Sequence, residues 1–234
     1  MPEAPSAVVA IVDYGMGNLF SVMRACEQVG MQAAATTSRA EILSADAVIV
    51  PGVGAFGDAM DTLMRLDLVG ALREVAASGK PLIGICLGMQ LLMERSHEFG
   101  LHDGLKIIEG EVVRLPESHQ GGRRMKVPQV GWNRISKPSR ASWEASWLRG
   151  VAEGEFMYFV HSFYVSPADQ GIVLSTTRYG SVEFCSSLQR GNVFACQFHP
   201  ERSGPQGLRL YRNIADHLRS RREGATAWQS SSSA

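Results

Sequence analysis

Short apolar runs alternate with amphipathic segments through the first ninety residues of the chain. Residues 7–12, 47–50 and 81–85 are almost wholly apolar, without the alternation of a half-exposed strand. They are therefore expected to be strands that are buried on both faces, as in a parallel sheet. Each run stops at a polar, Gly- or Pro-containing turn, which supports this assignment.

The segments between these runs have helical spacing. Asn18 can cap a helix that runs to about Gly30 and carries its apolar positions on one face. A single long helix is predicted after the second strand and is closed by Gly79. Strands that alternate with helices in this way indicate a doubly wound α/β sheet. The apolar stripe of the long helix consists of Met60, Leu63, Met64, Leu68, Leu72 and Val75.

After about residue 104 the pattern changes to shorter strands and turns, with a polar loop at 117–124 and a last amphipathic helix at 205–220. We expect one α/β domain over residues 7–220. It has a mostly parallel central sheet flanked by helices, with additional antiparallel strands in its C-terminal half. Residues 221–234 end in a Ser-rich stretch and are expected to be a disordered tail. The short strands are predicted at 105–114, 130–135, 156–165, 172–178, 182–189 and 193–198.

Composition excludes several kinds of partner. The 234 residues include 23 Lys+Arg and 23 Asp+Glu, so the formal net charge is zero and a broad basic field for nucleic acid is not expected. No apolar run approaches the ~18 residues of a membrane span. The first residues, Met1 to Pro5, lack a basic region followed by an apolar one, so no secretory signal is expected. These features predict a soluble, cytoplasmic protein.

The chain contains four cysteines, and none belongs to a C-x-x-C pair, so a zinc ribbon or a thioredoxin-type motif is not expected. Cys26, Cys185 and Cys196 lie in amphipathic or strand-like segments and are expected to be core residues. Cys86 differs, because it lies between a buried strand and a predicted helix.

Residues 84–88 (GICLG) form a strand–turn–helix pattern with Cys86 where many hydrolases carry a serine nucleophile. Such a tight turn forces the nucleophile into strained backbone angles, and flanking glycines remove Cβ clashes. Free N–H groups behind the turn favour a thiolate and can hold an oxyanion. The pattern alone leaves open that Cys86 is a buried residue at a strand end.

Residues 198–201 (FHPE) provide a candidate base. Pro200 favours extended geometry at His199, and residues two apart in an extended segment point to the same side. His199 and Glu201 can thus face one site as a base and the carboxylate that orients it. A surface turn with an incidental histidine is the alternative. His161 ends a strand but has no carboxylate near it in the sequence, so it is the weaker candidate.

Together, the motifs GICLGMQ (84–90) and FHPE (198–201) resemble the class I, or triad, glutamine amidotransferases, and the resemblance covers residue 8 to about 220. Within that family, further segments resemble one branch, the glutaminase subunits of imidazole glycerol phosphate synthases in histidine biosynthesis. These segments are DYGMGN (13–18), PGVGAFG (51–57) and VGWN (130–133).

The resemblance implies a reaction. Cys86 attacks the side-chain amide of L-glutamine and forms a thioester, His199 delivers the proton to the leaving ammonia, and Glu201 orients His199. The resemblance also implies an oxyanion hole and glutamine contacts. Backbone N–H groups of Leu87 and of the Gly52–Val53 peptide are expected to meet the oxyanion, and Gly52, Gln90, Ser162 and Phe163 are expected to contact glutamine.

The resemblance further implies a heterodimer with a (β/α)8-barrel cyclase subunit, whose interior conducts the ammonia. It implies neither a metal nor an organic cofactor. Glycines on both sides of Val53 are expected to leave its peptide planes free to rotate. The residues expected at the partner interface are Asn18, Lys126, Gln129, Trp132 and Asn133.

Three other functions remain open. A Cys hydrolase or peptidase on a similar scaffold commonly has His directly after the nucleophile, whereas Leu87 follows Cys86 here. A non-catalytic binding subunit would not need a complete nucleophile, base and carboxylate. An amidotransferase that serves another synthase, such as the pyridoxal phosphate one, would use the same reaction.

Overall fold

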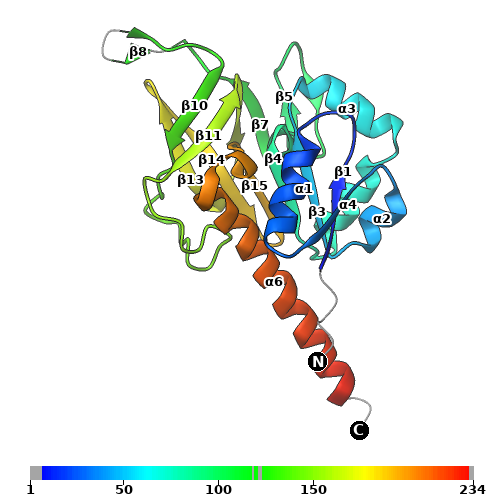
Figure 1. The fold of residues 1–234 in the computed structure, drawn as a ribbon. Coiled ribbons are helices and arrows are strands. Elements are labelled where there is room, and N and C mark those ends of the chain that lie inside the picture. The colour runs from blue at the N-terminus through cyan, green and yellow to red at the C-terminus, as the bar shows by residue number, and fades with distance from the viewer. Residues whose placement is uncertain (1–6, 118, 121–122, 232–234) are drawn as a thin grey trace.

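The computed structural model describes residues 7–117, 119–120 and 123–231, and the side chains of all of these except 119–120, 123 and 224–231 (Figure 1). Within these residues the helices are α1 Leu19–Gln28, α2 Arg39–Ser44, α3 Phe56–Arg65, α4 Val69–Ala77, α5 Leu87–Leu91 and α6 Gly204–Ser231, with 3-10 turns η1 Gln170–Ile172 and η2 Pro200–Arg202. The strands are β1 Val8–Val12, β2 Gln32–Thr36, β3 Ala47–Gly52, β4 Leu82–Cys86, β5 Met93–Ser96, β6 His102–Asp103, β7 Ile108–Arg114, β8 His119–Gln120, β9 Arg123–Arg124, β10 Gln129–Arg134, β11 Phe156–His161, β12 Phe163–Pro167, β13 Val173–Tyr179, β14 Val182–Arg190 and β15 Val193–Cys196.

The central sheet has the strand order β13-β14-β15-β4-β3-β1-β2 in the described part of the chain. The five strands from β15 to β2 are parallel, and β14 and β13 extend the sheet in antiparallel fashion. A second sheet, in the order β12-β7-β5-β6, and the β10–β11 and β8–β9 pairs contain the remaining described strands. The predicted fold class, a mostly parallel sheet with antiparallel strands added later in the chain, is confirmed.

Both faces of the central sheet are covered, which explains its apolar runs. In β1, Val9 and Ile11 pack in the core that contains residues of α1 and α6. The alternate residues Ala10 and Val12 pack in the core that contains residues of α2, α3 and α4. Each buried side chain in such a strand removes apolar area from water at ~25 cal/mol per Å², so the strand tolerates few polar positions.

The prediction of a single long helix up to Gly79 is wrong. The chain forms α3 and α4, separated by a turn in which Asp67 has φ +55°. The backbone N–H of Leu68 donates to the carbonyl of Leu63 at 2.9 Å and closes the end of α3. Leu68 is fully buried, so the apolar spacing continues across the turn and hides it in the pattern.

Two elements have no apolar signal. Strand β2 is mostly exposed at the edge of the sheet, and α2 buries Ile42 as its one fully buried residue.

The strand predicted over 156–165 is two strands, β11 and β12, because β11 pairs with β10 whereas β12 pairs with β7 in the other sheet. The break falls at Ser162, and this break becomes part of the candidate site.

Helix α6 runs past residue 220 and away from the body of the protein (Figure 1). Arg221 donates to the carbonyl of Gly79, and Arg222 forms an ion pair with Asp46. The disordered tail expected over 221–234 stays a prediction, and its last three residues lie outside the described part. Of the polar loop at 117–124, residues 118 and 121–122 also lie outside it.

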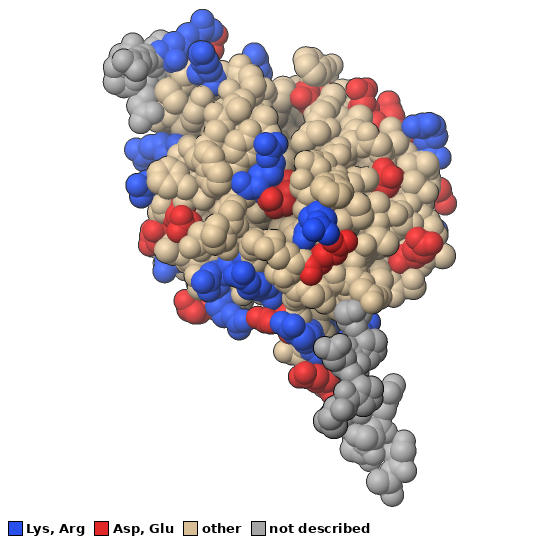
Figure 2. Space-filling view, in the orientation of Figure 1, with Lys and Arg blue, Asp and Glu red and all other residues tan. Residues whose placement is uncertain are grey.

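Basic and acidic side chains are interspersed on the face shown in Figure 2, with apolar and uncharged surface between them. This agrees with the formal net charge of zero. Within the described residues, no helix is long and apolar enough to cross a membrane.

Candidate active site

The turn between β4 and α5 holds Cys86 in a left-handed backbone conformation, with φ +54° and ψ −108°. For a residue with a Cβ, such angles cost of order 1–3 kcal/mol and persist only where the surroundings enforce them. The neighbouring glycines allow the close packing that does so. A Cβ at Gly88 would lie 1.7 Å from the carbonyl oxygen of Val50, and one at Gly84 would lie 2.8 Å from the carbonyl oxygen of Gly88.

His199 and Glu201 lie beside Cys86 because of the parallel pairing of β15 with β4, in which Cys196 is opposite Ile85. The two residues form a buried pair, with 2.8 Å between Nδ1 of His199 and Oε1 of Glu201. Their side chains are 6% and 2% exposed. The expected base and carboxylate therefore face one another.

The charges of this site act on one another. Burial alone would lower the pKa of His199, but the charge and proximity of Cys86, together with Glu201, raise it to about 10. A protonated imidazole is the partner that nucleophilic cysteines use to stabilise a thiolate. Nε2 of His199 is buried without a well-aligned hydrogen bond, and such bonds are often loose before substrate binds.

The loop after β3 lies next to Cys86, because Gly52 is paired with Cys86 in the β3–β4 register. The hydroxyl of Tyr14 donates to the carbonyl of Pro51 at 2.5 Å. A Cβ at Gly52 would lie 2.0 Å from that hydroxyl oxygen, so this glycine is required by space rather than by rotation. Gly54 has φ +121° and is the glycine whose conformation a side chain would oppose.

A cavity of about 230 Å³ opens beside Cys86, between the loop after β3 and the junction of β11 with β12. Glu98 is the one charged side chain among its described lining residues, and its Oε2 accepts from the N–H of Phe56 at 2.6 Å. Gly52 does not line the cavity. The lining residues expected from sequence are Val53, Cys86, Leu87, Gln90, Ser162 and Phe163.

Gln90 connects this cavity to the buried side of the site. Its Nε2 donates to the carbonyl of Phe163 at 2.9 Å and to Oε1 of Gln197 at 3.1 Å. Nε2 of Gln197 in turn lies 3.5 Å from Sγ of Cys86. Sequence reasoning missed Gln197, although it directly precedes the FHPE motif, because a glutamine next to a strand has no pattern of its own.

His161, the weaker candidate base, does not pair with a carboxylate. Its Nδ1 donates to the carbonyl of Phe163 at 2.8 Å, and its ring packs against Phe184 and Phe159. Burial lowers the pKa of His161 to about 4, against the opposing effect of that hydrogen bond. A neutral, inward-pointing imidazole fits a structural role.

The residues expected at a partner interface differ in exposure. Asn18 is exposed and caps α1 by accepting from the N–H of Ser21, and Lys126 is also exposed. On β10, Trp132 is 55% exposed and Asn133 is half-buried, whereas Gln129 is 2% exposed and points inward. The outward positions of β10 therefore carry the accessible side chains.

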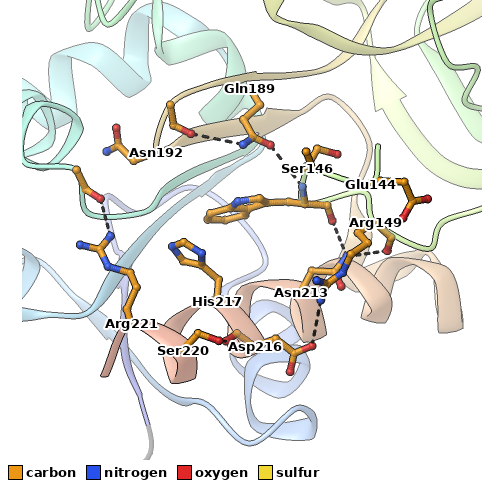
Figure 3. Close-up of a pocket in the computed structure, with 14 residues that line it drawn as sticks. Glu144, Ser146, Arg149, Gln189, Asn192, Asn213, Asp216, His217, Ser220 and Arg221 are labelled. Carbon is orange, nitrogen blue, oxygen red and sulfur yellow. Dashed lines mark hydrogen bonds and ion pairs between the residues drawn. The ribbon is translucent and has the colours of Figure 1, made fainter. Parts of the chain in front are cut away.

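A larger cavity, of about 530 Å³, lies far from Cys86, between α6 and residues 144–149 (Figure 3). Arg221 and Arg149 lie on opposite sides of it, and the ring of His217 lies between them, close to Trp147. It contains no cysteine and no pair of base and carboxylate among its described lining residues. Nor does any described group of His, Cys, Asp and Glu side chains have the arrangement of a metal site.

The strained Cys86, the buried His199–Glu201 pair and the open cavity on a parallel sheet are the features expected of a triad glutamine amidotransferase. Residues 10–218 match the family described as glutamine amidotransferase class-I, and the chain belongs to this family. Three similar curated proteins are each described as imidazole glycerol phosphate synthase subunit HisH. The protein of Moorella thermoacetica is 46% identical to this chain, and the match covers 90% of this chain and 95% of the relative. The protein of Geobacter metallireducens is 44% identical and that of Methanosarcina mazei 45% identical; each match covers 89% of this chain and 98% of the relative.

Solved structures share the fold at lower identity. A protein from Thermoplasma acidophilum, described as a putative GMP synthase subunit, has a TM-score of 0.68 and 17% identity, and covers 96% of this chain and 100% of its own. The PurLQS structure from Thermotoga maritima has a TM-score of 0.65 and 19% identity, over 92% and 100%. The resemblance inferred from GICLGMQ and FHPE is thus confirmed at the level of fold and family.

The contact between Gly52 and Tyr14 is testable by a double-mutant cycle. Gly52→Ala is expected to lower the free energy of unfolding by ~1–3 kcal/mol, because the new Cβ overlaps the Tyr14 hydroxyl. Tyr14→Phe alone should cost ~1 kcal/mol through loss of its hydrogen bond to Pro51. Since the second change removes the overlapping atom, urea denaturation should show the double variant at least ~0.5 kcal/mol more stable than additivity predicts. Strict additivity would contradict this interpretation of the contact.

Acid should destabilise the protein partly through His161. Its folded pKa of about 4 lies below the ~6.5 of an unfolded histidine, so the unfolded state gains the proton first as pH falls. The free energy of unfolding should therefore decrease from about pH 6.5 down to about pH 4, by up to ~3 kcal/mol from this residue. Denaturation of His161→Gln at several pH values should give a shallower slope than that of the unchanged protein; equal slopes would refute the assignment.

Proposed function

We propose that this chain is the glutaminase subunit of an imidazole glycerol phosphate synthase, which hydrolyses L-glutamine to glutamate and ammonia for histidine biosynthesis. The observation that carries the chemistry is Cys86, held at φ +54° beside the buried His199–Glu201 pair. The observation that favours this branch of the family is the identity of 44–46% to relatives so described.

The first half of the reaction forms a thioester. The Cys86 thiolate attacks the side-chain amide carbon of glutamine, and a sulfur–carbon bond forms. The tetrahedral intermediate then breaks its carbon–nitrogen bond, and His199 gives its proton to the departing nitrogen, which leaves as ammonia. Glu201 keeps the imidazole oriented and stabilises its protonated form, since Nδ1 of His199 is already committed to the Glu201 carboxylate.

The second half releases glutamate. His199, now neutral, takes a proton from water, and the resulting hydroxide attacks the thioester carbon. The sulfur–carbon bond breaks, the Cys86 thiolate is restored, and glutamate departs. Both halves develop negative charge on the former amide oxygen. We infer that the N–H of Leu87 and an N–H from the Gly52–Val53 peptide meet that oxygen, each such donor being worth ~3–4 kcal/mol in the transition state.

Glutamine recognition requires groups for its ammonium, its carboxylate and its reacting amide. Among the described residues that line the cavity, Glu98 is the one that supplies negative charge. We therefore infer that its carboxylate binds the α-ammonium of glutamine. Both N–H groups of Gln90 are used within the protein, which leaves its Oε1 as the atom that can accept from substrate. The carbonyl of Phe163 already accepts from Gln90 and His161. The carbonyl of Ser162 likewise accepts from the N–H of Leu115 at 2.8 Å, so we assign Ser162 and Phe163 to substrate through their N–H groups.

The partner we propose is a (β/α)8-barrel cyclase subunit that receives the ammonia. Exposed apolar side chains suit such an interface: Phe20 on α1 is 68% exposed, and Val130 and Trp132 on β10 are 60% and 55% exposed. Asn18, Lys126 and Asn133 would add polar contacts at its rim. The location we infer is the cytoplasm, where the four free cysteines would stay reduced.

Removing the nucleophile should separate the two reactions of the complex. Cys86→Ala, assayed with the barrel subunit, should lose glutamine-dependent synthesis by ~10⁴-fold or more. Synthesis from added ammonium salt should be unchanged, because only the ammonia source is lost. Loss of both activities would show that Cys86 is structural. If the unchanged chain hydrolysed glutamine but the barrel subunit formed no product from it, the chain would serve another synthase.

Glu98→Gln should raise the KM for glutamine by ~10–100-fold, the effect of losing one charge-assisted contact to the ammonium. The kcat should change less, since the contact is the same in the bound substrate and in the transition state. The amide can still accept from the N–H of Phe56, so the loop should be preserved. Exposed Glu109, which does not line the cavity, provides the matched control Glu109→Gln. A kcat loss without a KM change would contradict the binding role.

A further inference from the structure

Gln197 is fully buried and directly follows β15, whose last residue, Cys196, pairs with Ile85. The next step of the same parallel register brings Gln197 beside Cys86. Its backbone N–H donates to the carbonyl of Ser186 at 2.9 Å, so the main chain is held by the sheet and the amide group is left to the interior. A buried amide without partners would be costly, and this one has two polar neighbours.

The orientation of the Gln197 amide follows from a backbone atom. The Gln90 amide lies 2.9 Å from the carbonyl of Phe163, and a carbonyl only accepts, so the Gln90 atom there is Nε2. That Nε2 also lies 3.1 Å from the Gln197 amide, so the Gln197 atom facing it is the acceptor, Oε1. The remaining group of Gln197, its NH₂, must face Sγ of Cys86 at 3.5 Å.

An N–H group aimed at sulfur discriminates between the two forms of the cysteine. A thiolate is a charged acceptor and a thiol a weak one, so the hydrogen bond is stronger to the thiolate. The effect is greater where water is excluded, and Cys86 is 4% exposed. The positive charge of His199 acts on the same sulfur.

We propose that Gln197 is a catalytic residue, whose side-chain N–H donates to the Cys86 thiolate, and that Gln90 is the positioning residue that keeps this amide in the donating orientation. The inference rests on the proposed function for its place in the reaction, but the thiolate contact is measurable without glutamine. The series of hydrogen bonds from Phe163 through Gln90 and Gln197 to Cys86 also links the wall of the cavity to the sulfur. A substrate contact at Gln90 would therefore affect the hydrogen bond that Gln197 donates to that sulfur.

Alkylation of Cys86 by iodoacetamide, followed by mass spectrometry of each cysteine-containing peptide, measures the thiolate in the full chain. Gln197→Met has nearly the same shape and no donor. Its pH profile should move about one unit toward alkaline pH, so that it reacts about tenfold more slowly on the rising part of the profile and reaches the same limiting rate at high pH. A merely structural defect would lower the rate at every pH instead. Gln189→Met, at a half-buried glutamine that lines the remote cavity of Figure 3, is the matched control and should keep the original profile.

Gln197→Glu is the second variant, for the case in which the methionine variant fails to fold. Its carboxylate can still accept from Gln90 but presents an oxygen to the sulfur, so a larger alkaline shift is expected. Gln90→Met should shift the profile in the same direction by a smaller amount, because the Gln197 amide loses the donor that orients it. A folded Gln197 variant with the original profile, or an equal shift in Gln189→Met, would overturn the proposal.

Glutamine hydrolysis by the complex with the barrel subunit provides the second readout. Gln197→Met should lower kcat/KM by about the same factor as the alkylation rate at the same pH, and the loss should diminish toward alkaline pH. If the unchanged complex failed to hydrolyse glutamine, the proposed function would fall while the alkylation result would still decide the role of Gln197.

Discussion

The left-handed backbone of Cys86 is the constraint on which the site depends. The residue is the last of β4, which is hydrogen-bonded on one side to β3 and on the other to β15. The three parallel strands end together, so the loop after β3, Cys86 and the residues after β15 meet at one edge. Parallel sheets place binding crevices at this edge in general. Here the glycines at 84 and 88 let α5 pack against the strands closely enough to hold the strained turn.

The charges of the His199–Glu201 pair depend on the groups that surround the pair. The His199–Glu201 pair is nearly inaccessible, and taking such ions from water is costly unless they are paired. Cys196 and Tyr211, which lie near Glu201, have pKa values raised by burial and by that negative charge, so both stay neutral. The His199–Glu201 pair thus has neutral thiol and phenol groups beside it.

The cavity lies between two parts of the fold that are far apart in sequence. One wall comes from the parallel sheet and its loop at Val53, and the other from the junction of β11 and β12, at Val160 to Phe163. That junction exists because β11 and β12 belong to different sheets. The junction directly follows β11, the strand that pairs with β10, and β10 carries the exposed Trp132.

The sequence by itself determined the parallel sheet, since runs such as 7–12 and 47–50 are apolar at consecutive positions only where both faces of a strand are covered. It also determined Cys86 as a candidate nucleophile, and His199 with Glu201 as its base and carboxylate, because turn chemistry and two-residue spacing are local properties. The turn at Asp67 and the edge strand β2 did not follow from the pattern. In the first the apolar spacing continues through the turn, and in the second little apolar surface is buried.

Tertiary structure alone decided the roles available to Tyr14, Glu98 and Gln197. Each is defined by a neighbour at least 37 residues away in sequence: the carbonyl of Pro51, the N–H of Phe56 and the sulfur of Cys86. The direction of a buried amide depends on which atoms surround it, and hydrogen bonds of this kind form only after the strands have paired. Local sequence contains Cys86, His199 and Glu201, whereas the hydrogen-bond donors and the space around them arise from packing.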